Sequence, residues 1–234
     1  MRSSPPMISR RAVLLSLSGL AGAVALAGLV PAHRMTVLAQ VLLDPRPAPP
    51  PREMPVFARA EDDASRLITA GLAQIGVTTI YDAAYVTLTY PGGDVPPERG
   101  VCTDVVVRAY RTGLGLDLQK LVHEDMRNNF AAYPKTWGLK RPDRNIDHRR
   151  VPNLQTFFAR QGAGLPLSDT PADFRPGDIV TQMLPGNLPH IAVVTHLASP
   201  DGARPLCVHN IGAGARLEDI LFAYRLTGHY RFRL

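Results

Sequence analysis

The chain has 234 residues, of which 45% are hydrophobic and 20% are charged, a composition typical of a globular protein with its own core. Its formal net charge of +6 lies mostly at the N-terminus, because residues 1–39 contain four arginines and no acidic residue. No run of Lys or Arg interleaved with aromatic residues follows that segment, so nucleic-acid binding is not expected.

Residues 1–39 have the pattern of an export signal. The paired Arg10 and Arg11 precede an uncharged stretch, residues 12–32, that is rich in Ala, Leu, Val and Gly, as in twin-arginine signal peptides. We expect cleavage of this segment; the alternative is an uncleaved anchor, because about 20 apolar residues can span a bilayer. In both cases the folded domain is expected in the periplasm or cell envelope, with the signal segment as its only contact with the membrane.

The rest of the chain divides into a linker and one domain. Six prolines between residues 45 and 55 predict a semi-rigid linker over 40–57, followed by a domain over 58–234. Apolar residues at helical spacing predict helices over 58–75, 101–111, 116–132 and 151–160. Later segments have the pattern of strands, beginning at Ile179 and covering 190–197, 206–211 and 222–232. Helices followed by consecutive strands indicate an α+β fold with an antiparallel sheet.

Cys102 follows a loop rich in Gly and Pro and begins a predicted apolar helix. The N-terminus of a helix offers unpaired N–H groups and a partial positive charge, which stabilise a thiolate and can hold an oxyanion. We therefore expect a lowered thiol pKa and a nucleophilic role. The alternatives are an inert buried cysteine, or a disulfide with Cys207, the other of the two cysteines, which an oxidising compartment would permit.

A cysteine nucleophile needs an imidazole base and a polar group that orients the base. His190 opens one predicted strand and His209 lies in the next, so the two side chains meet if the register allows it. Alternation along a strand places His209 and Asn210 on opposite faces, so only one of them can orient His190. The histidines and cysteines lack the spacing of zinc sites, and neither a metal nor another cofactor is expected.

Further charged residues are candidates for contact with a substrate. His148 and Arg149 stand in a charged stretch, residues 147–150, for which a surface position is expected, and Asp104 follows the candidate nucleophile closely. His123 is expected on the solvated face of a helix, and His229 stands near the C-terminus without a recognisable motif.

Several segments resemble known cysteine peptidases. Cys102-Thr103-Asp104, Pro176-Gly177-Asp178, the strand from His190 and Val208-His209-Asn210 resemble, in this order, motifs of the NlpC-type cell-wall peptidases. A closer resemblance is to a bacterial family called domain of unknown function 1287, which is grouped with the papain-like fold. It is carried by residues 90–96, 100–105, 145–153 and 228–231.

This resemblance implies a papain-like, NlpC-type fold, with N-terminal helices packed on an antiparallel sheet. It makes Cys102 the nucleophile, His190 the general base and His209 the orienting residue. Tyr90 matches a tyrosine upstream of the nucleophile whose hydroxyl assists the oxyanion hole. Thr103 and Asp104 depart from the Ser and small residue of the NlpC motif, and the helical insert over 113–160 has no counterpart in the minimal peptidase domain. We expect the insert to shape the substrate cleft.

The implied activity is that of an exported thiol hydrolase, expected as a monomer, that cleaves an amide bond in peptidoglycan or a related peptide. Two alternatives remain open. The same fold supports acyl transfer or the hydrolysis of esters and lipids, and a chain with an inert Cys102 would be a non-catalytic module that binds the cell wall.

Overall fold

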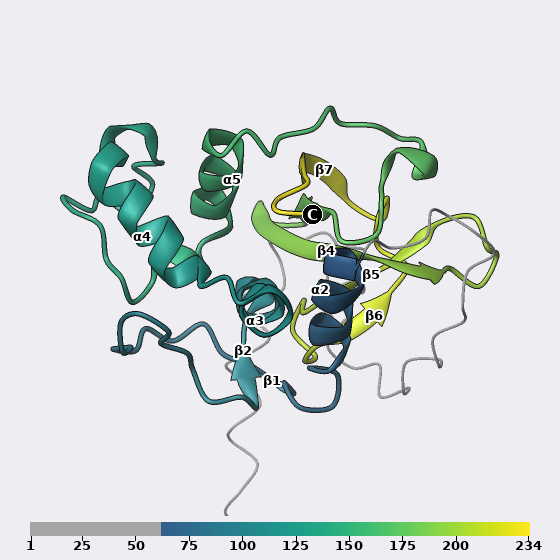
Figure 1. Cartoon of the computed structure of the whole chain (residues 1–234), viewed down its shortest axis with the longest axis horizontal. Helices are drawn as coiled ribbons and strands as arrows, with labels where there is room; N and C mark the ends of the chain where they lie inside the picture. Colours follow the sequence, from purple (N-terminus) through teal and green to yellow (C-terminus); the bar gives the residue numbers. More distant parts are fainter. Residues whose placement is uncertain (1–61) are drawn as a thin grey trace, which may run out of the picture. The chain divides into compact units, whose positions relative to one another are not determined.

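Helices and an antiparallel sheet form two layers in the computed structural model, which describes residues 62–234 (Figure 1). The predicted signal segment, the linker and the first residues of the predicted domain lie outside the described residues. No helix within 62–234 is both long and apolar enough to cross a membrane. The helices are α2 (Asp62–Leu72), α3 (Cys102–Leu114), α4 (Leu118–Asn129) and α5 (Val151–Arg160), with 3-10 turns η2 (Phe130–Ala132), η3 (Asp147–Arg149) and η4 (Pro171–Asp173).

The main sheet has five strands in the order β6-β5-β4-β3-β7, and each strand runs antiparallel to its neighbours. A separate parallel pair, β1 and β2, leads into α3 (Figure 1). The strands are β1 (Ile80–Tyr81), β2 (Arg99–Gly100), β3 (Ile179–Leu184), β4 (Leu188–Ala198), β5 (Pro205–His209), β6 (Arg216–Glu218) and β7 (Arg225–Tyr230). The predicted α+β architecture with an antiparallel sheet is therefore confirmed.

Local sequence explains where α3 begins and ends. Val101 is in an extended conformation, and its N–H donates to the Asp104 carboxylate at 2.7 Å, which caps the first turn from the third helical position. At the other end Gly115 adopts φ 68°, and its N–H donates to carbonyls of the last turn. Gly115 favours the end of the helix at this position, because glycine adopts left-handed backbone angles without steric cost.

The two faces of the sheet are buried against different partners. On one face Ile191, Val193 and Val208 pack with α2, α3 and α5, and Figure 1 shows α2 and α3 lying over this side. On the other face Ala192, Val194 and Cys207 pack with Phe174 and Leu221, which come from segments outside the strands. Successive residues of β4 and β5 thus pack into hydrophobic cores on opposite faces of the sheet, as expected for a sheet that is buried on both sides.

Two differences from the predicted elements have local causes. The predicted strand over 222–232 contains β7, and β6 was not predicted because it is only three residues long and follows a Gly-rich stretch. Strands β1 and β2 have two residues each, so they are too short to show the alternating pattern by which a strand is recognised in a sequence.

Candidate functional site

Cys102 is the first residue of α3 and is buried, with 4% of its surface exposed. Strand β5 ends at His209, and the next side chain, Asn210, donates from its amide to the Gly100 carbonyl at 3.1 Å. The backbone just before Cys102 is thereby tied to the end of β5. The backbone N–H of Ile191 on β4 is close enough to the Cys102 thiol to lower its pKa, so the sulfur lies near the strand residue that follows His190.

The expected lowering of the Cys102 pKa is wrong. Burial of the thiol raises its pKa to about 12, and the negative charge of Asp104 adds to this increase. Backbone N–H groups of Ile191, Thr103 and Cys102 itself act in the opposite direction, as expected at a helix N-terminus, but their effect is smaller. The thiol of the free protein is therefore protonated at neutral pH.

His190 and His209 meet at the sheet as the strand pattern predicted. Their ring centroids are 5.1 Å apart with an interplanar angle of 81°, so the edge of one ring faces the other. Both residues are buried, with 2% and 1% of their surfaces exposed. Burial, together with the neighbouring His209, holds the pKa of His190 well below its ordinary value. His190 is thus neutral at physiological pH and able to accept a proton.

Of the two candidates for orienting His190, His209 is the one whose ring lies against it. The Asn210 amide is taken by the Gly100 carbonyl, and its oxygen accepts from the Gly212 N–H at 3.0 Å. His209 has a further neighbour that the sequence did not indicate. Its Nε2 lies 3.0 Å from the Oε2 atom of Glu218 on β6, and this contact lowers the pKa of the Glu218 carboxyl.

Asp104 and Arg149 form a buried ion pair under the start of α3. The Asp104 carboxylate accepts from Arg149 Nε at 2.9 Å and from Arg149 Nη2 at 3.0 Å. The same guanidinium donates to the carbonyls of Asp82 and Ala84, and the Arg149 carbonyl accepts from the Thr103 hydroxyl at 3.0 Å. Burial and mutual pairing favour a positioning role for both residues over the expected contact with substrate.

Tyr90, to which the resemblance assigns an auxiliary role at the oxyanion hole, packs against α4. Its ring lies 5.2 Å from that of His123 on α4, and its hydroxyl is buried without a hydrogen-bond partner among the described residues. A different tyrosine lies near the start of α3. Partial burial and, as a smaller effect, the charge of Cys102 raise the pKa of Tyr81, which is 42% exposed on β1. The pairing of Tyr81 with Gly100 brings it there, and no motif in the sequence marks it.

The expected surface position of His148 is wrong. Only 2% of its surface is exposed, and burial lowers its pKa to about 3. A buried and neutral imidazole is an unsuitable contact for a substrate in solvent. His123 is also less solvated than expected, with its Nδ1 atom 3.6 Å from a carboxylate oxygen of the buried Asp147.

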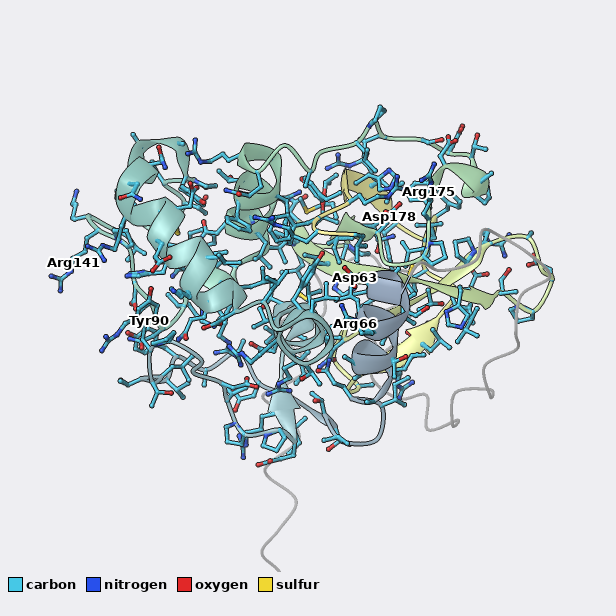
Figure 2. All side chains as sticks on the ribbon, in the orientation of Figure 1. Asp63, Arg66, Tyr90, Arg141, Arg175 and Asp178 are labelled. Atoms are coloured by element: carbon cyan, nitrogen blue, oxygen red, sulfur yellow. The ribbon has the colours of Figure 1, made fainter. Side chains whose placement is uncertain are left out.

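A second buried charged cluster ties the Pro-Gly-Asp turn to the last strand. The Asp178 carboxylate lies 2.7 Å from His229 Nε2 and accepts from Arg231 Nε at 2.7 Å. The His229 ring stacks on Phe174 with centroids 4.4 Å apart. Sequence reasoning left His229 without a role, although residues 176–178 and 228–231 both belong to the recognised motifs. Their common feature is this cluster, of which Figure 2 labels Asp178.

Cys102 and Cys207 are both free and belong to cores on opposite sides of the sheet, so the alternative of a disulfide between them is wrong. Burial raises the pKa of Cys207 as well. Within residues 62–234, no group of three or more His, Cys, Asp or Glu side chains is arranged to hold a metal ion.

Comparisons with known proteins agree with the resemblance to a family. The family model described as "Domain of unknown function (DUF1287)" matches residues 68–232. The chain is also 55% identical over 183 residues to the "Uncharacterized protein YijF" of Escherichia coli (strain K12), an alignment that covers 78% of this chain and 88% of the relative.

Proposed function

The chain belongs to the DUF1287 family, and from that premise we propose that it is an exported thiol hydrolase on a papain-like, NlpC-type fold. The observation that carries the proposal is the position of Cys102 near Ile191, the residue that follows His190, together with the contact between His190 and His209. The thiol begins a helix and lies near the N–H of Ile191, while the imidazole of the preceding residue, His190, faces a second imidazole. A nucleophile, a base and an orienting group are the parts that acyl transfer through cysteine requires.

The resting protonation states suggest how the reaction would start. Both Cys102 and His190 are neutral in the free protein, and the shifts of their pKa values oppose an ion pair, so the thiol proton would move to His190 only as the sulfur attacks a bound substrate carbonyl. A carbon–sulfur bond forms, and the oxyanion accepts from N–H groups at the first turn of α3. The imidazolium then gives its proton to the leaving amine as the carbon–nitrogen bond breaks, which leaves a thioester that water hydrolyses.

His209 and Glu218 would support the imidazolium in this scheme. The Glu218 carboxylate lies 3.0 Å from His209 Nε2, which favours a donating N–H on that side of the His209 ring. The other nitrogen, Nδ1, has no hydrogen-bond partner among the described residues, so in this scheme it would accept an N–H from the ring of His190. This arrangement parallels the way an Asp or Asn orients the base in other triads.

For the substrate we propose an amide bond in peptidoglycan, in its stem peptides or crosslinks. The support is the predicted export signal over residues 1–39 and the resemblance of the Cys102, Asp178, His190 and His209 motifs to those of cell-wall peptidases. An apolar rim fits a bound segment of extended substrate, because large hydrophobic side chains are exposed along the strand and loop next to the nucleophile, at Ile80, Tyr81, Tyr85 and Val86.

The test is digestion of purified sacculi. The mature protein should release muropeptides that mass spectrometry identifies, and Cys102→Ala should release none. Cys207→Ala is the matched control, because it removes the other buried thiol from the opposite side of the sheet and should leave release unchanged. Equal release by the wild type and Cys102→Ala would refute the role of the thiol.

A second candidate is a non-catalytic module that binds the cell wall, and the burial and raised pKa of the Cys102 thiol favour it. In that case Cys102→Ala should bind sacculi as the wild type does, and no product should appear with either protein. A pull-down with sacculi, run beside the digestion, distinguishes the two functions because only the hydrolase changes the muropeptide profile.

A further inference from the structure

The helical insert over 113–160 contains a small, shallow pocket that is open to solvent. Its walls are largely apolar and come from α4, from η2 and from the loop that follows them: Met126, Phe130, Pro134 and Leu139. Trp137 also lines the pocket and is 38% exposed. An exposed tryptophan at the edge of an apolar hollow is a frequent feature of ligand sites.

Two polar side chains reach the pocket from the start of α5. Arg150 is the extended residue just before α5 and Asn153 lies in its first turn, and both line the pocket. The Arg150 guanidinium stacks on Trp137, with its carbon 4.1 Å from the ring centroid. Among residues 62–234, Arg150 Nη1 and Asn153 Oδ1 are buried atoms without a hydrogen-bond partner. Buried polar atoms are almost always satisfied, so this pair calls for a partner from outside the protein.

The orientation of the Asn153 amide is determined by its neighbours. Its Nδ2 donates to the Asp147 carbonyl at 3.0 Å, so the atom left without a partner is the oxygen, which can only accept. Asn153 itself is 1% exposed and cannot turn toward water. A ligand must therefore offer a donor to Asn153 and an acceptor to Arg150.

We propose that this pocket binds a secondary amide that carries a small acyl group, such as the acetamido group of an N-acetylated sugar or amino acid. The amide oxygen accepts from Arg150 Nη1 and the amide N–H donates to Asn153 Oδ1. The acyl methyl group lies against the apolar walls, and a ring or chain attached to the nitrogen meets Trp137. A carboxylate is disfavoured, because its second oxygen would face the oxygen of Asn153.

The pocket does not require that Cys102 is catalytic, but its position links it to that residue. Arg150 follows Arg149, whose carbonyl accepts from the Thr103 hydroxyl beside the nucleophile. A ligand held at Arg150 would thus contact the same segment that buttresses the first turn of α3. This arrangement suits a site that anchors one part of a polymer while another part reaches Cys102.

Trp137 is the single tryptophan of the chain, so intrinsic fluorescence reports directly on the pocket. The probes are N-acetylglucosamine and N-acetylalanine methylamide, with glucosamine and glucose as controls that lack the amide. We expect saturable changes in emission with dissociation constants on the order of 1 mM for the acetylated probes, as is usual for ligands of this size. Glucosamine and glucose should produce no saturable change.

Variants separate binding in the pocket from nonspecific quenching. Arg150→Met keeps the alkyl stem on Trp137 and removes the donor, and should weaken binding by about tenfold or more. Arg141→Met is the matched control, because Figure 2 shows Arg141 projecting away from the molecule and it does not line the pocket. Cys102→Ala should bind as the wild type does, which keeps this test independent of any hydrolase activity.

Each outcome decides the proposal. Binding of only one acetylated probe would support it and identify the source as sugar or peptide. Equal binding of glucose and N-acetylglucosamine would overturn the amide assignment. Absence of saturation with both acetylated probes, or unchanged affinity in Arg150→Met with a native circular dichroism spectrum, would overturn the site itself.

Discussion

At the scale of single residues, Cys102 shows two physical effects in opposition. The N–H groups and partial charge at a helix N-terminus stabilise a thiolate by roughly 1 kcal/mol when they act alone at a surface. Complete burial of a charged group can shift its pKa by about 3 to 5 units, which corresponds to several kcal/mol. Because Cys102 is 4% exposed, burial decides the outcome and raises the thiol pKa.

This balance predicts the pH dependence of alkylation at Cys102. In a Cys207→Ser background, the rate of modification by iodoacetamide should be low at pH 7 and rise about tenfold per pH unit up to pH 10, because only the thiolate reacts. The measurement is mass spectrometry of the intact protein over time, with free cysteine as the reference thiol. A fast rate that stays constant from pH 5 to 8 would instead reveal a thiolate–imidazolium pair in the free protein.

At the scale of elements, the start of α3 depends on the buried pair of Asp104 and Arg149. The carboxylate caps the first turn of the helix, while the guanidinium links it to the backbone of residues 82–84. Each of these hydrogen bonds involves either a residue within two positions of Cys102 or the backbone of residues 82–84, which follow Tyr81 in the chain. The position of the nucleophile is therefore set by a charged pair that the sequence presents as two separate motifs.

We predict that Asp104→Asn lowers the free energy of unfolding by about 3 kcal/mol, since it leaves the buried Arg149 without its counter-charge. The matched control is Asp63→Asn, which breaks the exposed pair between Asp63 and Arg66 on α2 that Figure 2 labels. That change should cost less than about 1 kcal/mol. Urea denaturation followed by circular dichroism gives both values, and equal losses would show that the buried pair has no special role.

Elements with a clear period were predictable from the sequence, while contacts between short elements were not. Residues 151–160 were predicted as a helix and form α5, and the predicted start at Ile179 is the start of β3. The pairing of Tyr81 with Gly100 depends on two-residue strands, so no pattern in the sequence indicated that Tyr81 lies near the start of α3. The meeting of His190 and His209 was predictable because both strands are long enough for alternation to indicate their shared face.

Burial could not be predicted for isolated polar residues. The stretch around His148 is rich in charge, which usually indicates a surface, yet His148, Arg149 and Asp147 are all buried. What encloses them is the packing of α4 and α5 around η3, and such packing between distant segments leaves no local pattern in the sequence.

At the scale of the whole molecule, Asp147 makes stability depend on pH. Burial raises the pKa of its carboxyl to about 7, compared with about 4 for an unfolded chain. The folded state thus holds a proton that the unfolded state has lost, so this contribution to stability is fully present below pH 4 and disappears as the pH rises to 7. Asp147 should therefore weaken the fold most at alkaline pH.

Asp147→Asn replaces the protonated carboxyl with a neutral amide that can still accept from the Asp143 N–H. We expect the variant to be more stable than the wild type at pH 8 and about equal to it at pH 4. Urea denaturation at both pH values measures the two differences. If the gap in stability between the two proteins is the same at pH 4 and pH 8, the carboxyl does not titrate in this range in the folded state.

Strand β7 protects the edge of a neighbouring strand. It pairs with β3, Arg231 joins the Asp178 cluster, and Phe232 packs against Phe157 and Phe158 in the helical core. A variant that lacks residues 225–232 would therefore lose part of the aromatic core and expose β3 as an unpaired edge. An exposed edge can pair with strands of other chains, so such a variant should aggregate or be degraded rather than accumulate in the native state.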